Sequence, residues 1–263
     1  RLSLVGSEMC IRDRSRPILL AVSHGTSDAE GARAIADLVG AVAAAMPEVE
    51  VRSAFVDVQQ PDAADLLPTI DGPVVIVPLL LSRGFHVHHD LHGMAAKKAD
   101  AVVSAPMGPD PRLAEVLAER LSETLSTVPD STHTEDAPVI LAVAGSRDPA
   151  SLTDAEAMAS LLSLRLGRRV ELAYLAAREP DLPHALREHP DAVVSTYLLA
   201  RGFFFDLTLR QAPGRRVTAP LLDGTTVPQP LIDLVVARYE EASEQLLTAQ
   251  SPGAALTPEP AQS

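Results

Sequence analysis

Histidine is concentrated in one short stretch of this sequence. Four of the eight histidines lie within seven positions, in the segment FHVHHDLH that begins at Phe85, and Asp90 stands among them. Imidazole binds borderline divalent metals and exchanges protons near neutral pH. The cluster therefore indicates a metal site or a proton-transfer site. The alternative is a solvated helix start that happens to be rich in histidine.

The element that must position this cluster is the apolar run directly before it. Residues 74–81, VVIVPLLL, are rich in β-branched side chains and are followed by Ser82-Arg83-Gly84. Such a run predicts a strand that is buried on both faces of a parallel sheet. Ligands of open α/β sheets bind beyond the carboxyl ends of the strands, and the histidines follow at that end.

Strands and helices are predicted to alternate along the rest of the chain. We expect the other strands at 17–23, 49–56, 101–104, 139–144, 170–175, 192–199 and 217–219. We expect a helix from 27 or 28 to about 46, a short helix from Pro61, and helices over 111–126, 150–166 and 230–247. This alternation is typical of doubly wound parallel sheets in the α/β class.

The chain also contains an internal repeat. With an offset of about 120 residues, ILLAVSHGTSD aligns with VILAVAGSRDP, VRSAFVDVQQP with VELAYLAAREP, and VIVPLLLSRGFHV with VVSTYLLARGFFF. Two tandem α/β domains of similar topology are therefore predicted, and we expect them to face each other across a shared cleft.

Three chemically active side chains of the first repeat are apolar in the second. The pairs are His24 with Ala144, Asp57 with Ala176, and His86 with Phe204. This difference predicts one active half and one half that is kept for its shape. Arginine persists in both repeats, as Arg83 and Arg201, and we expect both to flank the cleft and bind carboxylates of a ligand.

In these segments the sequence resembles the sirohydrochlorin chelatases, a group of ATP-independent (class II) chelatases that includes cobaltochelatases and ferrochelatases. The family patterns are His-Gly-Ser/Thr, Ala-Phe-x-Glu/Asp…Pro and Gly-x-His-x-x-x-Asp. They stand here as His24-Gly25-Thr26, Ala54-Phe55-Val56-Asp57 with Pro61, and Gly84-Phe85-His86 with Asp90. The resemblance covers about residues 17–240 and implies the long, fused two-domain form of the family.

The resemblance implies insertion of a divalent metal into sirohydrochlorin, on the way to sirohaem or cobalamin. The metal would be Fe²⁺ or Co²⁺, with Ni²⁺ as a further candidate. His24 and His86 would bind the metal and accept protons, Asp57 would act with them, and Asp90 would orient His86. The implied substrate-binding residues are Gly84, Phe85, Arg83 and Arg201. The other histidines of the cluster, His88, His89 and His92, are either solvated or a weak metal-collecting rim.

Domain boundaries are predicted from composition and from the repeat. Residues 1–15 resemble a translated sequencing-adapter read-through, so we expect a non-native or disordered leader there. Residues 16–126 form the predicted active domain, and the polar segment 127–137 the linker. Residues 138–249 form the degenerate domain, and residues 250–263 are predicted to be a disordered tail.

Composition narrows the possible functions. The net charge of −13 argues against a nucleic-acid partner, and no apolar run is long enough to span a membrane. The single cysteine, Cys10, excludes an internal disulfide framework and fits a reducing, cytoplasmic compartment. No P-loop motif occurs, so no ATP or other nucleotide is expected, and no G-x-S-x-G elbow supports a hydrolase.

We expect a monomer of two fused repeats that takes a tetrapyrrole. A non-catalytic carrier of metal or tetrapyrrole on the same fold is the alternative.

Overall fold

Two parallel sheets form the framework of the protein. The computed structural model describes residues 16–126 and 138–249, apart from the side chains of residues 85–89. The strands of the first sheet have the order β2-β1-β3-β4 and are β1 (Ile18–Ser23), β2 (Val51–Phe55), β3 (Val74–Pro78) and β4 (Ala101–Val103). The second sheet has the order β6-β5-β7 and contains β5 (Val139–Val143), β6 (Val170–Tyr174) and β7 (Val193–Tyr197). The predicted α/β class and parallel pairing are confirmed.

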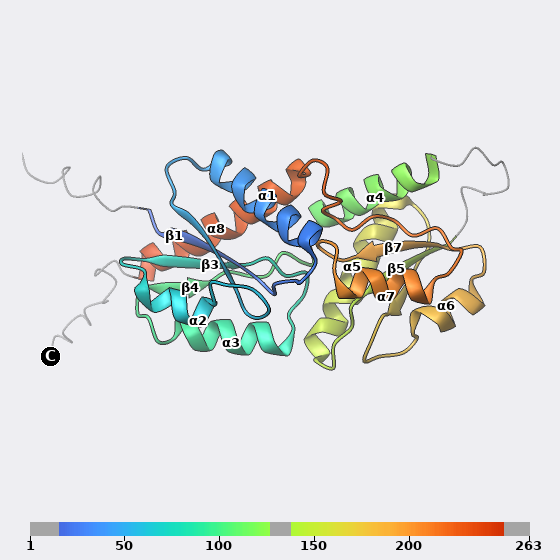
Figure 1. Ribbon diagram of the computed structural model, residues 1–263, viewed down its shortest axis with the longest axis horizontal. Coiled ribbons are helices and arrows are strands. Elements are labelled where there is room, and N and C mark those ends of the chain that lie inside the picture. Colours follow the sequence, from blue (N-terminus) through green and yellow to red (C-terminus); the bar gives the residue numbers. More distant parts are fainter. Residues whose placement is uncertain (1–15, 127–137, 250–263) are drawn as a thin grey trace, which may run out of the picture.

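Each sheet is covered by helices on both faces. On the first sheet, Leu19 and Ala21 of β1 point into one apolar cluster and Leu20 and Val22 into another, because successive side chains of a strand face opposite ways. The covering helices are α1 (Ala29–Ala45), α2 (Ala63–Leu66) with the 3₁₀ turn η1 (Leu67–Thr69), and α3 (Phe85–Ala95). The second sheet is covered by α5 (Pro149–Leu166), α6 (Leu182–Glu188) and α7 (Phe203–Gln211) (Figure 1).

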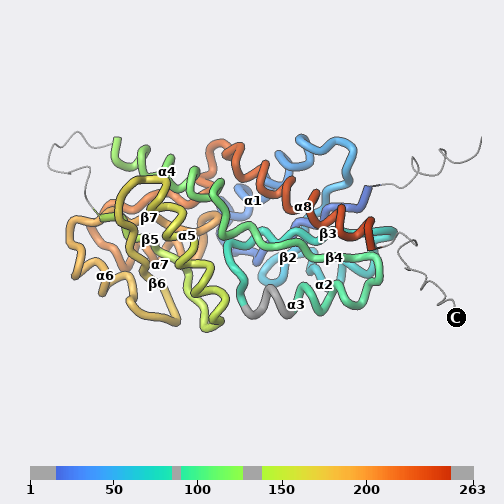
Figure 2. The backbone as a smooth tube through the Cα atoms, turned by 180° about the vertical axis from the view of Figure 1, so that it is seen from behind, coloured from blue at the N-terminus to red at the C-terminus, as the bar shows by residue number. Residues whose placement is uncertain are grey.

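The last helix of each repeat packs on the sheet of the other repeat. Helix α4 (Pro111–Ser126) contacts α5 and β7, and α8 (Gln229–Ala249) contacts α1, β3 and β4. Figures 1 and 2 both show α8 beside α1 and α4 over the second sheet. The sequence expectation placed each helix with its own repeat. The structural lobes therefore do not follow the chain segments 16–126 and 138–249, because each segment contributes its last helix to the other lobe.

Equivalent arginines fasten the exchanged helices. Arg120 of α4 donates to the carbonyl oxygen of Leu221 at 3.1 Å and pairs with Asp223. Arg238 of α8 donates to the carbonyl oxygen of Pro106 at 2.9 Å and pairs with Asp110 at 3.2 Å. Each arginine thus holds the loop that precedes the other repeat's last helix.

Asp110, in the loop before α4, forms ion pairs with both Arg112 and Arg238. Burial would raise the pKa of its carboxyl group, but hydrogen bonds from Arg112 and the charges of Arg112 and Arg238 outweigh burial and hold that pKa below its ordinary value of 3.8. The carboxylate is therefore ionised in the folded protein at neutral pH, between two guanidinium groups.

One predicted strand is reduced to a single bridge. Residues 217–219 were expected to form the edge of the second sheet, and only Val217 forms a bridge, with Val194. The amide of Thr196 donates to the hydroxyl of Thr218 at 3.0 Å rather than to a backbone carbonyl, so a side chain interrupts the ladder. The second sheet therefore has three named strands where the first has four.

The largest apolar core is shared by both halves. One cluster of buried side chains runs from β1, β3 and α1 through α4 and α5 to α8. Separate clusters lie beneath α2 and α3 and beneath α6 and α7. Among the described residues, no helix combines the length and the apolar character needed to cross a bilayer.

Candidate functional site

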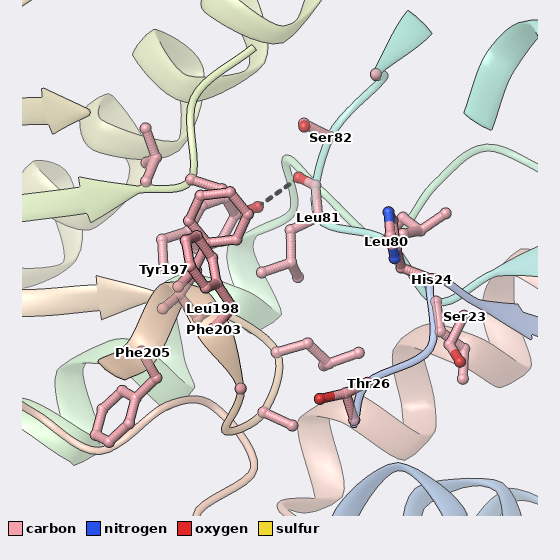
Figure 3. A pocket seen from close by; sticks show the side chains of 18 of the residues that line it. Ser23, His24, Thr26, Leu80, Leu81, Ser82, Tyr197, Leu198, Phe203 and Phe205 are labelled. Carbon is pink, nitrogen blue, oxygen red and sulfur yellow. Dashed lines mark hydrogen bonds between the residues drawn. The ribbon is translucent and has the colours of Figure 1, made fainter. Parts of the chain in front are cut away.

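A cavity of about 530 Å³ lies between the two sheets at the carboxyl ends of their strands. Its volume falls within the usual range of small-molecule sites. The first half contributes the segments after β1 and β3, and the second half contributes the segments after β5 and β7. Figure 3 shows His24 and Leu80 on one side and Tyr197 and Phe203 on the other. The shared cleft predicted from the repeat is therefore present at the expected strand ends.

His24 directly follows β1 and lines the cavity with an exposed side chain. The next residue, Gly25, has φ = 91°, and a Cβ there would lie 2.2 Å from the carbonyl oxygen of Asp57. The amide of Asp57 donates to the carbonyl oxygen of His24 at 3.1 Å, and Gln59 accepts from the amide of Thr26 at 2.9 Å. These contacts lock the loops after β1 and β2 together and fix the backbone from which the imidazole projects.

Asp57 lies close to His24 in the backbone but is not among the residues that line the cavity. Its exposed carboxylate accepts a hydrogen bond from the amide of Val58 at 2.7 Å. Val58 itself has φ = 64°, a costly conformation for a β-branched residue, and it does line the cavity. The role expected for Asp57 in catalysis thus stays a prediction.

The segment after β3 approaches the same cavity. Gly84 lines the cavity and precedes α3. The side chains of Phe85 and His86, like those of His88 and His89, lie outside the described residues, so their expected roles remain predictions. Asp90 and His92 are exposed on α3. Among the side chains that the structure describes, no three His, Cys, Asp or Glu residues form a metal-binding group.

The second half supplies an apolar wall. Ala144 and Phe204, at the positions equivalent to His24 and His86, both line the cavity, together with Leu198, Leu199 and Phe203. The hydroxyl group of Tyr197 donates to the carbonyl oxygen of Leu81 at 2.8 Å and so ties the two walls together. Burial raises the pKa of Tyr197, which keeps this donor protonated. No sequence pattern predicts this contact of Tyr197, because a tyrosine at the end of a buried strand is indistinguishable from an ordinary core residue.

The two equivalent arginines make reciprocal contacts between the halves. Arg83 pairs with Asp154 of α5 at 2.6 Å, and its own amide donates to the same carboxylate at 2.8 Å. The hydrogen bonds that the Arg83 guanidinium donates to Asp154, together with the negative charge of that carboxylate, raise the pKa of Arg83. Arg201 pairs with Glu30 of α1 at 3.0 Å.

Only one of these arginines is placed to contact a ligand in the cavity. Arg201 lines the cavity, and its Nε atom is buried without a hydrogen-bond partner in the described part of the chain. Arg83 is absent from the lining, and its guanidinium is engaged by Asp154. Carboxylate binding, expected for both, stays a prediction for Arg201, which lines the cavity, whereas Arg83 joins the two halves.

Among the side chains that the structure describes, the cavity combines the imidazole of His24 with a wide apolar surface. An exposed histidine can bind a metal or accept a proton, and the facing wall can hold a flat apolar ligand between the halves. The cavity is open to ligands at the point where both halves meet. The prediction that the first half alone carries the active groups stays a prediction.

Proteins of known activity resemble parts of this chain. A sirohydrochlorin ferrochelatase from Priestia megaterium is 31% identical over 145 residues, which cover 51% of this chain and 53% of the relative. The chain thus spans about half the length of that relative. A sirohydrochlorin cobaltochelatase from Sulfolobus acidocaldarius is 27% identical over 115 residues, covering 41% of this chain and 92% of the relative.

A solved structure matches over nearly the whole described chain, and a family model covers both repeats. SirB from Bacillus subtilis, solved with Fe³⁺, superimposes with a TM-score of 0.72 at 19% identity, covering 89% of this chain and 98% of SirB. This likeness shows the fold. The CbiX family model matches residues 18–124 and 138–219, on either side of the linker. With both repeats matched in sequence and the fold shared, the chain belongs to the CbiX family.

Proposed function

We propose that this protein inserts a divalent metal, Fe²⁺ or Co²⁺, into sirohydrochlorin without ATP. The observation that carries the proposal is the placement of His24 at the strand-end cavity, opposite an apolar wall, in a chain of the CbiX family. Relatives named for ferrochelatase and cobaltochelatase activity on sirohydrochlorin support the same substrate and both metals.

The chemistry requires a group that both binds metal loosely and accepts protons. A divalent metal replaces the two pyrrole N–H protons of the ring, so the net charge is unchanged and two protons must be accepted as the metal enters. A neutral imidazole can accept one of these protons, while the other passes to water, or it can donate its lone pair to the metal. His24 performs one of these roles in the proposal, and His86 the other.

Arg201 gives the cavity a cation for a carboxylate-rich substrate. The chain carries a net charge of −13, so an anionic ring needs local positive charge to bind. The guanidinium group of Arg201 is partly exposed and lines the cavity, where it can bind a carboxylate of the ring. Asp57 and Asp90 are proposed to assist His24 and His86, respectively.

The proposal also covers assembly and location. Because one chain supplies both walls of the cavity, we infer that a monomer is sufficient for activity. The lone cysteine fits a reducing cytoplasm.

The decisive experiment follows metal insertion into sirohydrochlorin by absorbance under anaerobic conditions. Fe²⁺, Co²⁺ and Ni²⁺ are compared with and without enzyme, with and without ATP. His24→Ala and His86→Ala serve as variants, and Leu164→Ala, an exposed site on α5, serves as the control. We expect wild-type insertion well above the spontaneous rate, independent of ATP, and lost in both histidine variants.

The outcomes separate an enzyme from a carrier. Wild-type insertion at the spontaneous rate with tight ring binding would contradict the proposal and favour a carrier. An unchanged rate in His24→Ala would remove the imidazole from the mechanism. The order of rates among the three metals would rank them as substrates.

A further inference from the structure

Phe203 is a large apolar side chain that the fold leaves uncovered. It is 67% exposed and lines the cavity at the first position of α7. Its ring meets that of Phe204 edge-on, with centroids 5.4 Å apart. Figure 3 places it on the wall opposite His24. Burial in a core does not account for an aromatic ring in this position.

A cation accompanies this ring. The guanidinium carbon of Arg210, on the same helix, lies 5.9 Å from the centroid of the Phe203 ring, which is within the range of a cation–π contact. Arg210 is exposed, and no carboxylate of the described residues forms an ion pair with it. Arg210 is not among the residues that line the cavity, so its donors can reach only the part of a ligand that extends past Phe203.

The neighbouring arginine shows that this arrangement is distinct. Arg201 also stacks on a ring, with its guanidinium carbon 5.4 Å from the centroid of Phe205. However, Phe205 is buried and Arg201 is paired with Glu30. Phe203 and Arg210 are thus the aromatic–cation pair of this wall that is open to a ligand.

We propose that Phe203 and Arg210 form the ring-binding platform of the site. The face of a planar, carboxylate-rich macrocycle stacks on Phe203, and Arg210 binds one of the carboxylates at its rim. This inference rests on the proposed function and extends it, because it assigns substrate binding to the half that lost the histidines. Phe203 would present the ring, and His24 would meet the metal from the opposite side.

The test separates ring binding from metal insertion. Uroporphyrin, a metal-free porphyrin with more carboxylates than coproporphyrin, is titrated against wild-type protein and variants, and quenching of its fluorescence gives Kd. Phe203→Ala is compared with Leu209→Ala, a truncation of another exposed apolar residue on α7 that does not line the cavity. We expect Phe203→Ala to weaken binding about tenfold, Phe203→Tyr to retain it, and Leu209→Ala to change nothing.

The charge is tested separately. We expect Arg210→Gln to weaken uroporphyrin binding about fivefold at low salt and less at high salt, since an exposed charge is screened. Its effect on coproporphyrin should be smaller. Arg165→Gln, another exposed arginine of the same half, is the matched control.

Kinetics complete the test with sirohydrochlorin as substrate. Phe203→Ala should raise KM and leave kcat nearly unchanged, because the platform binds the ring without touching the metal or the protons. Equal Kd values for Phe203→Ala and Leu209→Ala in an active chelatase would overturn this inference and leave the proposed function intact. Tight uroporphyrin binding that depends on Phe203, in a protein that inserts no metal, would overturn the proposed function and leave the platform intact.

Discussion

The two halves of this protein share a backbone and differ in chemistry. The glycine after the first strand of each half has nearly the same φ, 91° for Gly25 and 88° for Gly145. The loop after the second strand contains a residue with positive φ in both halves, Val58 at 64° and Ala177 at 66°. Even the isolated bridge after this loop is repeated, between Phe55 and Asp62 and between Tyr174 and Asp181.

The difference between the halves teaches which features belong to the fold and which to the site. Strained loop conformations persist where histidine and carboxylate have been lost, so the fold itself requires them. The wall without histidine has gained phenylalanine and keeps its place at the cavity. The second half therefore remains part of the cavity although it lacks the equivalent of His24.

The largest expected effect concerns the histidine that only one half retains. We expect His24→Ala to lower the metal-insertion rate by at least about 100-fold, because a positioned base contributes on that scale. The double variant His24→Ala/Ala144→His should stay inactive. A histidine at position 144 would have Ala176 and Phe204 near it, at the positions where the first half has Asp57 and His86. Absorbance assays of both variants measure the effect. Recovery of activity in the double variant would show that the two walls are interchangeable.

The reciprocal arginine contacts should differ in strength. Asp154 is only 2% exposed, so Arg83→Ala leaves a buried carboxylate without its guanidinium and should lower the free energy of unfolding by about 3 kcal/mol. Arg201→Ala breaks an exposed pair with Glu30 and should lower it by less than about 1 kcal/mol. Urea unfolding of the two variants measures both values.

Two further results complete this test. The double variant Arg83→Met/Asp154→Leu should regain much of the stability lost in Arg83→Ala, because neither charge is then left unpaired. Equal losses for Arg83→Ala and Arg201→Ala would contradict an asymmetric interface.

The sequence predicts the repeated framework well because strand ends and turns have local signals. Apolar runs identify the strands, and the helix predicted to begin at residue 27 or 28 is capped by Asp28, whose side chain accepts from the amide of Gly31 at 2.7 Å at the start of α1. The alignment of the two repeats also shows that the second half has alanine at the positions of His24 and Asp57. These features depend on residues that are neighbours in the chain.

The exchange of α4 and α8 has no such local signal. Both helices have buried apolar residues, and both carry an arginine, Arg120 or Arg238, that contacts the loop before the other repeat's last helix. Only the path of the chain in space decides which sheet each helix covers. The contribution of Phe203 to the cavity cannot be predicted from the sequence for the same reason. Phe203 lines the cavity only because the fold places the strand end of β7 opposite that of β1.

Substitution of the equivalent glycines tests whether the two loops are held alike. A Cβ at Gly25 would lie 2.2 Å from the carbonyl oxygen of Asp57, and one at Gly145 would lie 2.0 Å from that of Ala176. We expect each glycine-to-alanine variant to lower the free energy of unfolding by about 2 kcal/mol. Only Gly25→Ala should also lower the insertion rate, because it displaces His24. Loss of activity in Gly145→Ala at an unchanged fold would show that the second loop contributes more than shape.

The smallest expected effect concerns the ion pair between Arg238 of α8 and Asp110, and this effect depends on pH. The pKa of Asp110 is lower in the folded protein than its ordinary value, so its ionised form adds stability that is fully present above about pH 4 and is lost as the pH falls through the folded pKa. Asp110→Asn should therefore lower the free energy of unfolding by about 1 kcal/mol at pH 7. Below the ordinary pKa the difference from wild type should shrink, since both proteins then carry a neutral side chain. Asp223→Asn removes the carboxylate that pairs with Arg120. Urea unfolding of both variants from pH 7 to pH 3 compares the two ion pairs. A wild-type advantage over Asp110→Asn that grew on acidification would mean that the carboxylate is held in its neutral form, which the flanking Arg112 and Arg238 oppose.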